Sequence, residues 1–542
     1  MSTALESASR IEWLASELAR PEAFPRGAGP IEVRRTFVSL LVFTRERVYK
    51  LKQALDLGFI ESKTLARRRY LCDEEVRLNA RLAPGVHLGV VPITRGPDGH
   101  LLVGGSGEVV EWAVEMVRLP ADRMLARRLE LGVIDNEQMN ALAVLLADFH
   151  REAATGPGVD EFGSPAAIGV SIEENFEQLA PFVRRPRAEP PAGIAVLSSA
   201  QHAFLRLRAR GFLARQRALL EARVAAGRIR EGHGDLHAEN VCQMPERFVV
   251  YDRIEFNPRL RCLDVANDLA FLVMDLDARG FSGFGSYLAH RYAEVTGDSE
   301  LARLLGFYKG YRAIVRAKVA ALSARNPALA SEEREALRCE SLCYVQLALG
   351  YELTPGLVCL AGLPASGKSF LGARLARPLR AALLHSDVRR KRLAGLGTTA
   401  SASAGWGEGL YAMKQRQGTY RSLLEDAVRA LRAGRSVVVD ASFTRQAFRR
   451  PFVDAAVRLG VPYCFVHVSA PEEVVRARMA ARGPESGSDA DFGIYLRERA
   501  AFEPLDEVPG GHVLDVRSGE GAPEDQVSEL LERLIGLEAA ER

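Results

Sequence analysis

An octapeptide at residues 362–369, Gly-Leu-Pro-Ala-Ser-Gly-Lys-Ser, constrains the fold of this chain more than any other feature, because it matches the phosphate-binding pattern G-x-x-x-x-G-K-[ST]. The apolar run 357–361 precedes it, as a buried parallel strand should, and helix-forming residues follow over 370–376. The alternative, a coincidental glycine turn, does not account for these flanking elements. The sequence therefore predicts an α/β domain with a parallel sheet.

The loop predicts a nucleotide triphosphate site. Its glycines let backbone N–H groups turn inward around phosphate oxygens, Lys368 reaches the terminal phosphates, and the Ser369 hydroxyl is placed to ligate magnesium at the helix N-terminus. ATP and Mg²⁺ are thus the expected cofactors. The residues predicted to bind the nucleotide are Gly362, Pro364, Ala365, Ser366, Gly367, Lys368 and Ser369.

Two further strands of this half are followed by carboxylates. A strand expected over 381–384 is followed by Asp387, and ligands bind at the carboxyl ends of parallel strands. We expect Asp387 to orient an acceptor hydroxyl, with a helix N-cap as its alternative role. The apolar run 436–439 is followed by Asp440, which is predicted to assist magnesium binding through water or through Ser369.

The phosphate loop, Asp387 and the arginines after it resemble P-loop small-molecule and polynucleotide kinases and zeta-toxin-like kinases. In nucleotide-kinase-like proteins a lid supplies arginines to the transferring phosphate, so the resemblance makes Arg478 and Arg482 candidate catalytic residues. The alternative is a solvated basic face on the helix expected over 472–482. The composition of 395–409, rich in Gly, Ala, Ser and Thr, favours a flexible insertion.

The first half of the chain begins with strand-forming residues. β-branched and aromatic residues dominate 31–43 and 47–51, and the compact turn between them predicts a hairpin. Alternation along the second strand puts Lys50 and Lys52 on one face. One of these lysines could face a nucleotide, although solvated surface charges are the commoner role of such residues.

Residues 233–240, His-Gly-Asp-Leu-His-Ala-Glu-Asn, are followed by a strand over 248–251 and then by Asp252. This segment resembles the catalytic loop H-G-D-x-x-x-x-N and the metal-binding aspartate of the aminoglycoside phosphotransferase family, whose members are relatives of protein kinases. The resemblance covers about residues 31–349 and implies a two-lobed, protein-kinase-like domain of the α+β class.

The resemblance implies a role for each acidic or amide residue around this segment. Phosphoryl transfer needs a carboxylate that accepts or orients the hydroxyl proton, and Asp235 fits this role. Asn240 and Asp252 would hold the metal ions that bridge the nucleotide phosphates. Asp264 and Asp268 resemble the family's D-L-A turn and are expected to support the catalytic loop.

In the same family pattern a strand lysine pairs with a glutamate on the first helix. This pair carries over best to Lys52 and to Glu75, which lies on a helix expected over 71–82, while Lys50 and Glu74 remain rivals. The chain lacks a G-x-G-x-x-G sequence over the phosphates, as members of this family often do.

The adenine base would be received by the strand and connector expected over 109–117. Backbone groups near Glu115, Met116 and Val117 are the candidate contacts, again by resemblance to the kinase-like pattern.

The whole chain of 542 residues is too long for one core. We expect an N-terminal helical extension over 1–30, the kinase-like domain over 31–350, a linker over 351–356 and the P-loop domain over 357–542. Because 72 basic and 69 acidic residues leave a net charge of +3, the overall charge does not indicate nucleic acid or an anionic membrane as a partner. Seven scattered cysteines, with no secretory signal and no run of about twenty apolar residues, favour a cytoplasmic protein without a membrane span.

The two motifs together predict a bifunctional ATP-dependent phosphotransferase, and the chain resembles fused bacterial proteins with an aminoglycoside phosphotransferase-like domain and a C-terminal P-loop kinase domain. Each site is expected to transfer a terminal phosphoryl group to a hydroxyl of a sugar, an aminoglycoside-like or nucleoside-like compound, or a polynucleotide. The alternatives are an ATP-gated regulatory or binding protein and a toxin-like protein kinase pair. The sequence names neither acceptor and gives no oligomeric state.

Overall fold

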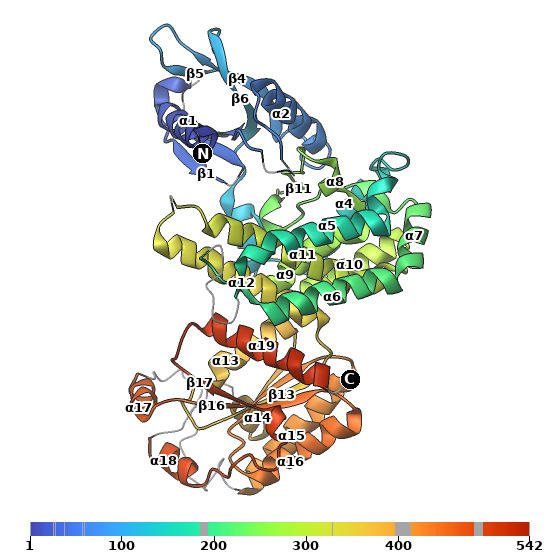
Figure 1. Cartoon of the computed structure of the whole chain (residues 1–542), viewed down its shortest axis with the longest axis vertical. Helices are drawn as coiled ribbons and strands as arrows, with labels where there is room; N and C mark the ends of the chain where they lie inside the picture. The colour runs from blue at the N-terminus through green and yellow to red at the C-terminus, as the bar shows by residue number, and fades with distance from the viewer. Residues whose placement is uncertain are drawn as a thin grey trace. The chain divides into compact units, whose positions relative to one another are not determined.

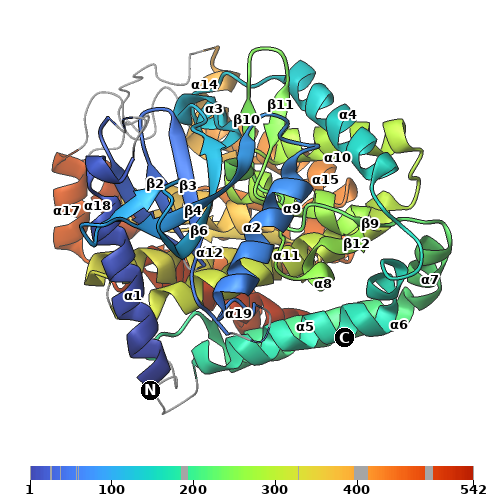
Figure 2. The ribbon, with the colours of Figure 1, turned by 90° about the horizontal axis from the view of Figure 1, so that it is seen from above.

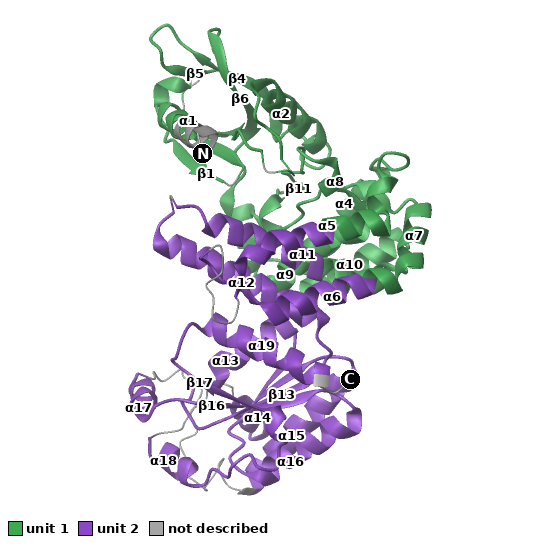
Figure 3. Ribbon diagram, in the orientation of Figure 1, with its two compact units in different colours: residues 1–171, 213–309 green, residues 172–212, 310–542 purple. Residues whose placement is uncertain are grey.

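The computed structural model describes residues 2–540, apart from 25, 26, 28, 37, 57, 59, 185–192, 328, 396–412 and 482–491. The chain divides into two compact units (Figure 3). Unit 1 contains residues 1–171 and 213–309, and unit 2 contains residues 172–212 and 310–542. Each unit combines helices with a β-sheet (Figure 1), which confirms the expected α/β and α+β fold class. None of the helices in the described ranges is both long and apolar enough to cross a membrane.

Unit 1 contains a six-stranded antiparallel sheet. Its strands are β1 (Glu32–Arg35), β2 (Ser39–Phe43), β3 (Arg47–Lys52), β4 (His87–Arg95), β5 (Leu101–Val103) and β6 (Glu108–Val117). They lie in the order β1-β2-β3-β6-β4-β5, and β2 with β3 forms the predicted hairpin. The run expected as one strand over 31–43 contains both β1 and β2, because the Thr36 N–H donates to the Ser39 carbonyl at 2.9 Å and closes a turn between them.

Two helices cover opposite faces of this sheet (Figure 2). The hydrophobic cluster around α1 (Ser2–Leu18) includes Leu51 of β3, whereas the cluster that includes Cys72 of α2 (Leu65–Asn79) contains Val48 of β3. Side chains therefore alternate between the two faces along β3, as predicted.

The helix α2 differs from the helix expected over 71–82 at both ends. It begins earlier because the Thr64 hydroxyl accepts a hydrogen bond from the Arg67 N–H at 3.1 Å and caps the N-terminus. It ends at Asn79, whose side-chain amide donates to the Glu75 carbonyl at 2.8 Å.

The rest of unit 1 is mainly helical. Its elements are α3 (Leu125–Glu130), α4 (Asn136–Glu152), α7 (Arg217–Ala225), β9 (Ile229–Glu231), η5 (Ala238–Asn240), β10 (Val241–Gln243), β11 (Phe248–Val250), α8 (Pro258–Arg261), β12 (Cys262–Asp264), α9 (Val265–Ala278) and α10 (Ser282–Thr296). The strands β10 and β11 form one two-stranded sheet and β9 and β12 another. Every residue of α9 from Val265 to Asp277 is buried, so this helix forms the centre of the helical part.

Unit 2 is built on a parallel sheet of five strands, which confirms the parallel sheet predicted for the C-terminal half. They are β13 (Leu357–Ala361), β14 (Ala382–His385), β15 (Val437–Asp440), β16 (Tyr463–Ser469) and β17 (Val513–Arg517), in the order β14-β15-β13-β16-β17. The other elements wholly in this unit are β7 (Val183–Arg184), β8 (Leu197–Ser198), α12 (Ser331–Glu352), α13 (Lys368–Leu379), α14 (Ser386–Leu393), α15 (Met413–Arg432), α16 (Gln446–Leu459), α17 (Glu472–Ala480), α18 (Phe492–Ala500) and α19 (Pro523–Ala540). Residues of α5 (Pro165–Leu179), α6 (Ser199–Arg215) and α11 (Leu301–Ala324) belong partly to each unit.

Helices cover both faces of the parallel sheet (Figure 1). On one face α15 and α16 close a core that includes Cys359 and Val439. On the other face α13 approaches β13 so closely that a Cβ on Gly372 would lie 2.7 Å from the Leu360 side chain. The strand β13 is therefore buried on both sides, which accounts for its continuous apolar sequence.

The helix α12 packs directly on the P-loop fold of unit 2. A Cβ on Gly350 would lie 1.9 Å from the Pro378 carbonyl oxygen at the end of α13, and the Gln346 side chain donates to the Glu524 carbonyl at 2.6 Å. The compact units thus group α12 with the parallel sheet, whereas the predicted boundary at 351–356 separates them. The linker predicted over 351–356 between two domains stays a prediction.

Candidate functional site

One buried carboxylate accepts hydrogen bonds from the backbone of the segment 233–240 in unit 1. The backbone N–H groups of His233 and Gly234 donate to Asp268 at 2.6 and 2.9 Å. Gly234 has φ +87, and a Cβ there would lie 2.7 Å from the Leu260 carbonyl oxygen, so a larger residue would not fit. These contacts confirm that Asp268 supports the loop.

Two buried histidines add further hydrogen bonds that hold this loop and its supporting carboxylate in place. His150 contacts Asp268 at 3.0 Å and the Tyr292 hydroxyl at 2.8 Å. Burial alone would raise the pKa of Asp268, but the hydrogen bond from His150 and the nearby His233 lower that pKa overall. The ring of His233 donates to the Tyr251 carbonyl at 2.9 Å and accepts from the Asp235 N–H at 3.3 Å. His233 therefore positions the backbone of the predicted catalytic aspartate.

We expect the free energy of unfolding of unit 1 to fall as the pH drops from about 6.5 to about 4, because burial lowers the pKa of His233 to about 4. Between these values the unfolded state binds a proton that the folded state excludes, so stability rises with pH and is lost on acidification. The loss from this residue should approach about 3 kcal/mol at the acid limit. Urea unfolding at pH 7 and pH 5 should show a smaller pH dependence in His233→Gln than in the unaltered protein. An equal dependence in both proteins would contradict this assignment.

The predicted metal-binding residues lie next to this loop. The Asn240 amide donates to the Asp235 carbonyl at 3.0 Å, and the Tyr251 N–H donates to the Asn240 carbonyl at 3.0 Å. Asp252 follows with φ +67, a left-handed backbone that is costly for a residue with a Cβ. The Arg253 N–H, which donates to the Asn79 side chain at 3.0 Å, holds the chain in this turn. Asp235 and Asp252 retain side-chain exposures of 36% and 39%, so both carboxylates can reach a ligand.

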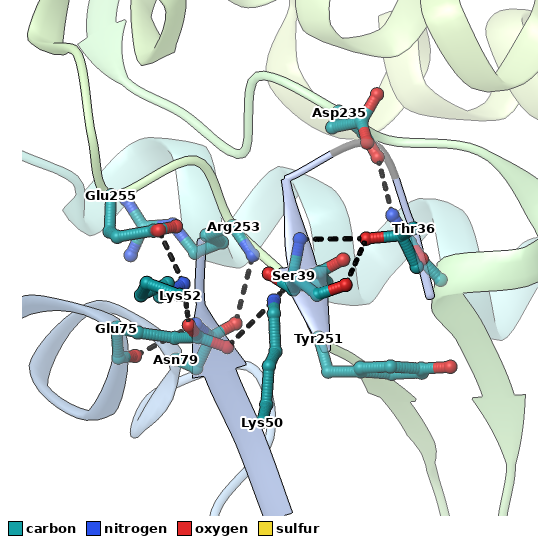
Figure 4. A network of polar contacts seen from close by, with 12 residues as sticks. Thr36, Ser39, Lys50, Lys52, Glu75, Asn79, Asp235, Tyr251, Arg253 and Glu255 are labelled. Atoms are coloured by element: carbon teal, nitrogen blue, oxygen red, sulfur yellow. Dashed lines mark hydrogen bonds and ion pairs between the residues drawn. The ribbon is translucent and has the colours of Figure 1, made fainter. Parts of the chain in front are cut away.

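The two lysines of β3 converge on one glutamate (Figure 4). Lys50 donates to Glu75 at 2.9 Å, and Lys52 contacts the other oxygen of the same carboxylate. Lys50 also contacts Asp252, while Lys52 donates to Glu255 at 2.5 Å. The predicted contact of Lys52 with Glu75 is present, and so is the rival contact of Lys50.

The rival glutamate does not join this cluster, since Glu74 accepts two hydrogen bonds from Arg77 at 2.8 Å on the surface of α2. Burial would lower the pKa of Lys50, but the charges of Asp252, Glu75 and Glu255 raise it well above its ordinary value. Both lysine pKa values are raised, so both side chains stay protonated. Sequence reasoning missed Glu255, although it follows the predicted metal-binding aspartate by three positions.

The structure places Glu115 and Val117 inside the sheet. Glu115 pairs with Tyr49 of β3 and with Gly89 of β4, and Val117 pairs with Arg47. The Glu115 carboxylate accepts from the Tyr49 hydroxyl at 3.3 Å. Binding of adenine near these residues stays a prediction.

The backbone conformation of the phosphate loop in unit 2 requires glycine at two positions of its sequence. Ala365 and Gly367 have φ values of +61 and +101, and Gly367 caps the N-terminus of α13. A Cβ on Gly362 would lie 2.2 Å from the Val468 carbonyl oxygen, and one on Gly367 would lie 2.4 Å from the Ser518 hydroxyl. The loop therefore tolerates only glycine at both positions.

The polar side chains of the loop could hold an anion, and Ser369 with Asp440 could hold a metal ion. Lys368 donates to the Leu363 carbonyl at 2.7 Å, and Ser369 donates to Asp440 at 2.6 Å. The hydroxyl oxygen of Ser366 is buried and has no hydrogen-bond partner among the described residues. A bound phosphate would supply that partner.

Asp440 lies at the centre of this arrangement. It also contacts His385 at 2.9 Å, a residue that sequence reasoning missed although it precedes Asp387 at the carboxyl end of β14. Burial would raise the pKa of Asp440, but the hydrogen bond from His385, the charge of Lys368 and the hydrogen bond from Ser369 lower it. Asp440 is therefore held as a carboxylate.

Two more predicted residues of unit 2, Asp387 and Arg478, lie at the same end of the sheet. Asp387 lies in the first turn of α14, whose N-cap is His385, and accepts a hydrogen bond from Arg390 at 2.6 Å. The alternative N-cap role of Asp387 is therefore wrong. Arg478 of α17 donates to the Ala365 carbonyl at 3.2 Å, so it touches the phosphate loop. Arg482 and residues 396–409 of the predicted insertion lie outside the described residues.

The oxygen ligands that each site offers suit magnesium better than a metal ion that is coordinated entirely by protein side chains. No group of three or more His, Cys, Asp or Glu side chains suited to a metal ion occurs in the part of the chain that the structure describes. Ser369 with Asp440, and Asn240 with Asp252, would each offer oxygen atoms to an ion. Mg²⁺ commonly binds through one or two carboxylates and keeps water and phosphate oxygens as its other ligands.

Comparisons with known proteins agree with the P-loop architecture. Residues 357–505 match the family model described as AAA domain. Uncharacterized proteins of Mycobacterium tuberculosis and Mycobacterium bovis are 29% identical to this chain over 478 residues, which cover 87% of this chain and 90% of each relative.

Solved structures of kinases also match parts of the chain. A choline/ethanolamine kinase family protein from Mesorhizobium loti has a TM-score of 0.37 and 14% identity, and covers 62% of this chain and 94% of its own. A sugar kinase from Janibacter has a TM-score of 0.26 and 22% identity, over 34% of this chain and 98% of its own. A gluconokinase from Sinorhizobium meliloti has a TM-score of 0.25 and 19% identity, over 35% of this chain and 94% of its own. The family match over residues 357–505 confirms a P-loop domain in the C-terminal half, while its expected bounds of 357–542 stay a prediction. The mycobacterial relatives align across both halves of the chain.

Proposed function

We propose that the protein is an ATP-dependent phosphotransferase with two kinase-type sites, one in each unit. Each site would transfer the terminal phosphoryl group of ATP to a hydroxyl of a small molecule or a polynucleotide. The observation that carries the proposal is the hydrogen bond from Ser369 to Asp440 at 2.6 Å beside the phosphate loop. This pair supplies oxygen ligands for Mg²⁺ where the loop supplies backbone N–H groups for phosphate.

In unit 2, Asp387 would take the proton of the acceptor hydroxyl. A bond forms between the acceptor oxygen and the terminal phosphorus, the bond from that phosphorus to the bridging oxygen breaks, and ADP leaves. Lys368 and Arg478 would offset the negative charge of the transferring group, since Lys368 belongs to the loop and Arg478 touches it. Ser369 and Asp440 would hold Mg²⁺, which neutralises the phosphate oxygens when bound.

In unit 1, Asp235 would take the hydroxyl proton in the same reaction. Asn240 and Asp252 would hold the metal, and a lysine of β3 oriented by Glu75 would bind the nucleotide phosphates. Contact of one lysine with both Glu75 and Asp252 supports this arrangement, because it brings a fixed positive charge to the predicted metal-binding carboxylate.

Transfer from labelled ATP with magnesium tests the proposal. The unaltered protein is compared with Asp235→Ala, Lys368→Ala and the double variant across sugars, aminoglycosides, nucleosides and oligonucleotides, with circular dichroism as the control for folding. We expect each single substitution to abolish transfer to one acceptor class and the double variant to lose both, because the two sites use separate residues.

Two outcomes would count against this function. Labelling that survives in the double variant would show that neither site performs the transfer. ATP binding at both sites without transfer to any acceptor would favour the alternative of an ATP-gated regulatory protein.

A further inference from the structure

One buried carboxylate near the phosphate loop has no role in the reaction described above. Glu498 of α18 is 6% exposed, and one of its oxygens lies 3.4 Å from the Arg416 guanidinium. Its other oxygen, Oε2, is buried and has no hydrogen-bond partner among the described residues. A buried acceptor without a donor is costly, so native proteins rarely keep one unless a ligand or water satisfies it.

This carboxylate belongs to the same end of the sheet as the phosphate loop. Burial raises the pKa of Glu498 above its ordinary value, and the charges of Arg416, Lys368 and Asp387 also act on that pKa. Its partner Arg416 also donates to the Thr444 hydroxyl at 3.2 Å, and Thr444 lies in the segment that follows β15 and Asp440. Glu498 therefore lies on the side where an acceptor would meet the nucleotide.

The charges around Glu498 indicate what kind of acceptor it would bind. The two arginines whose charges act on Glu498 each have a carboxylate partner, since Arg416 contacts Glu498 and Arg390 donates to Asp387 at 2.6 Å. An anionic acceptor would have to compete with these carboxylates for the arginines. An oxygen that lacks a donor can instead accept a hydrogen bond from a hydroxyl group of a neutral ligand.

We propose that Glu498, held by Arg416, binds a hydroxyl group of a neutral polyhydroxylated acceptor whose reacting hydroxyl lies at Asp387. The inference rests on the proposed phosphotransfer at the phosphate loop and names the acceptor class of that site. A purely structural ion pair between α15 and α18 is the competing explanation of the same contact.

The test uses the full chain carrying Asp235→Ala, so that transfer at the other proposed site is silent. Initial rates of ADP formation are measured with glucose, myo-inositol and glycerol as neutral probes, and with gluconate and glucose 6-phosphate as anionic probes. We expect transfer to at least one neutral probe. Glu498→Gln should raise the KM for that probe by about tenfold or more, because the amide replaces one acceptor oxygen with a donor, and should leave the KM for ATP within about twofold.

The matched control is Glu472→Gln, which changes an exposed glutamate of α17 that pairs with Arg476 and Arg499. It should leave both KM values unchanged. If Glu498→Gln does not fold, calorimetric binding of the neutral probes to the unaltered chain with a non-hydrolysable ATP analogue takes its place. Binding of a neutral probe supports the proposal, and its absence overturns it.

Other outcomes separate this inference from the function on which it rests. Transfer to anionic probes alone, or an unchanged acceptor KM in Glu498→Gln, overturns the inference while leaving a working kinase. If Lys368→Ala changes neither ATP binding nor ADP formation, the phosphate loop does not perform the proposed transfer. Both the proposed function of this site and the inference are then overturned.

Discussion

Replacing Asp235 with asparagine is expected to lower the kcat of transfer at the unit 1 site by about 100- to 10,000-fold, which is the usual contribution of a positioned general base. An amide cannot take the proton of the acceptor hydroxyl. The fold of the loop should survive, because Asn240 bonds to the backbone carbonyl of Asp235 and His233 bonds to its backbone N–H. The KM for ATP should therefore change little.

Initial rates in a Lys368→Ala background measure this effect, because that substitution silences the proposed phosphate-loop site. Asp148→Asn is the matched control, since the half-exposed Asp148 side chain of α4 accepts a hydrogen bond from Arg151, its neighbour one turn along the helix. A kcat within about tenfold of the unaltered protein would remove Asp235 from the role of base.

The phosphate-loop half of the chain was largely predictable. The strands β13 and β15 match the expected apolar runs 357–361 and 436–439 closely, because a strand buried on both faces has a continuous apolar sequence that local composition reveals. The contact of Ser369 with Asp440 also follows from local rules, since adjacent parallel strands bring their carboxyl ends to one edge.

The errors in the first half arose where one polar side chain decides a boundary. The Thr36 hydroxyl accepts a hydrogen bond from the Ser39 N–H and divides a run of strand-forming residues into two strands, and Thr64 starts α2 ahead of its apolar pattern. Periodicity over a window cannot detect a single turn or cap of this kind. Alternation also could not separate Lys50 from Lys52, because residues two apart in a strand share a face.

Contacts between distant segments were beyond the reach of the sequence. Nothing local marks Glu498 as the partner of Arg416, because the pair joins α18 to α15 through the fold of unit 2. The grouping of α12 with the parallel sheet likewise depends on Gly350, which allows a close approach to Pro378. A glycine inside a helical pattern gives no indication of which segment it will meet.

Substitution of the two β3 lysines should separate structural from phosphate-binding roles. Lys52→Met leaves the buried carboxylates of Glu75 and Glu255 without one of their shared positive charges. Removing one partner of a buried ion pair typically costs about 3–5 kcal/mol, so we expect the free energy of unfolding of unit 1 to fall by that amount. Lys50→Met should cost less stability, because one of its two partners, Asp252, is 39% exposed and can be hydrated, while the other, Glu75, keeps its contact with Lys52.

The activity of the two variants should show the opposite order. Lys50 contacts both Glu75 and the predicted metal-binding Asp252, so it is the better placed lysine for the nucleotide phosphates. We expect Lys50→Met to reduce transfer at the unit 1 site far more than its loss of stability explains, and to raise the KM for ATP. Lys52→Met should keep measurable transfer at temperatures where it remains folded.

Urea unfolding followed by tryptophan fluorescence, together with initial rates in the Lys368→Ala background, gives both quantities for each variant. Lys63→Met is the matched control, because Lys63 forms an exposed ion pair with Asp56 and such pairs contribute little to stability. If Lys52→Met abolishes ATP binding while folding normally, Lys52 is the phosphate-binding lysine and Lys50 takes the supporting role. The pairing of a strand lysine with Glu75 that the kinase-like resemblance implies would then be correct for Lys52. The contact between Lys50 and Asp252 would serve only to neutralise that carboxylate until a metal ion binds.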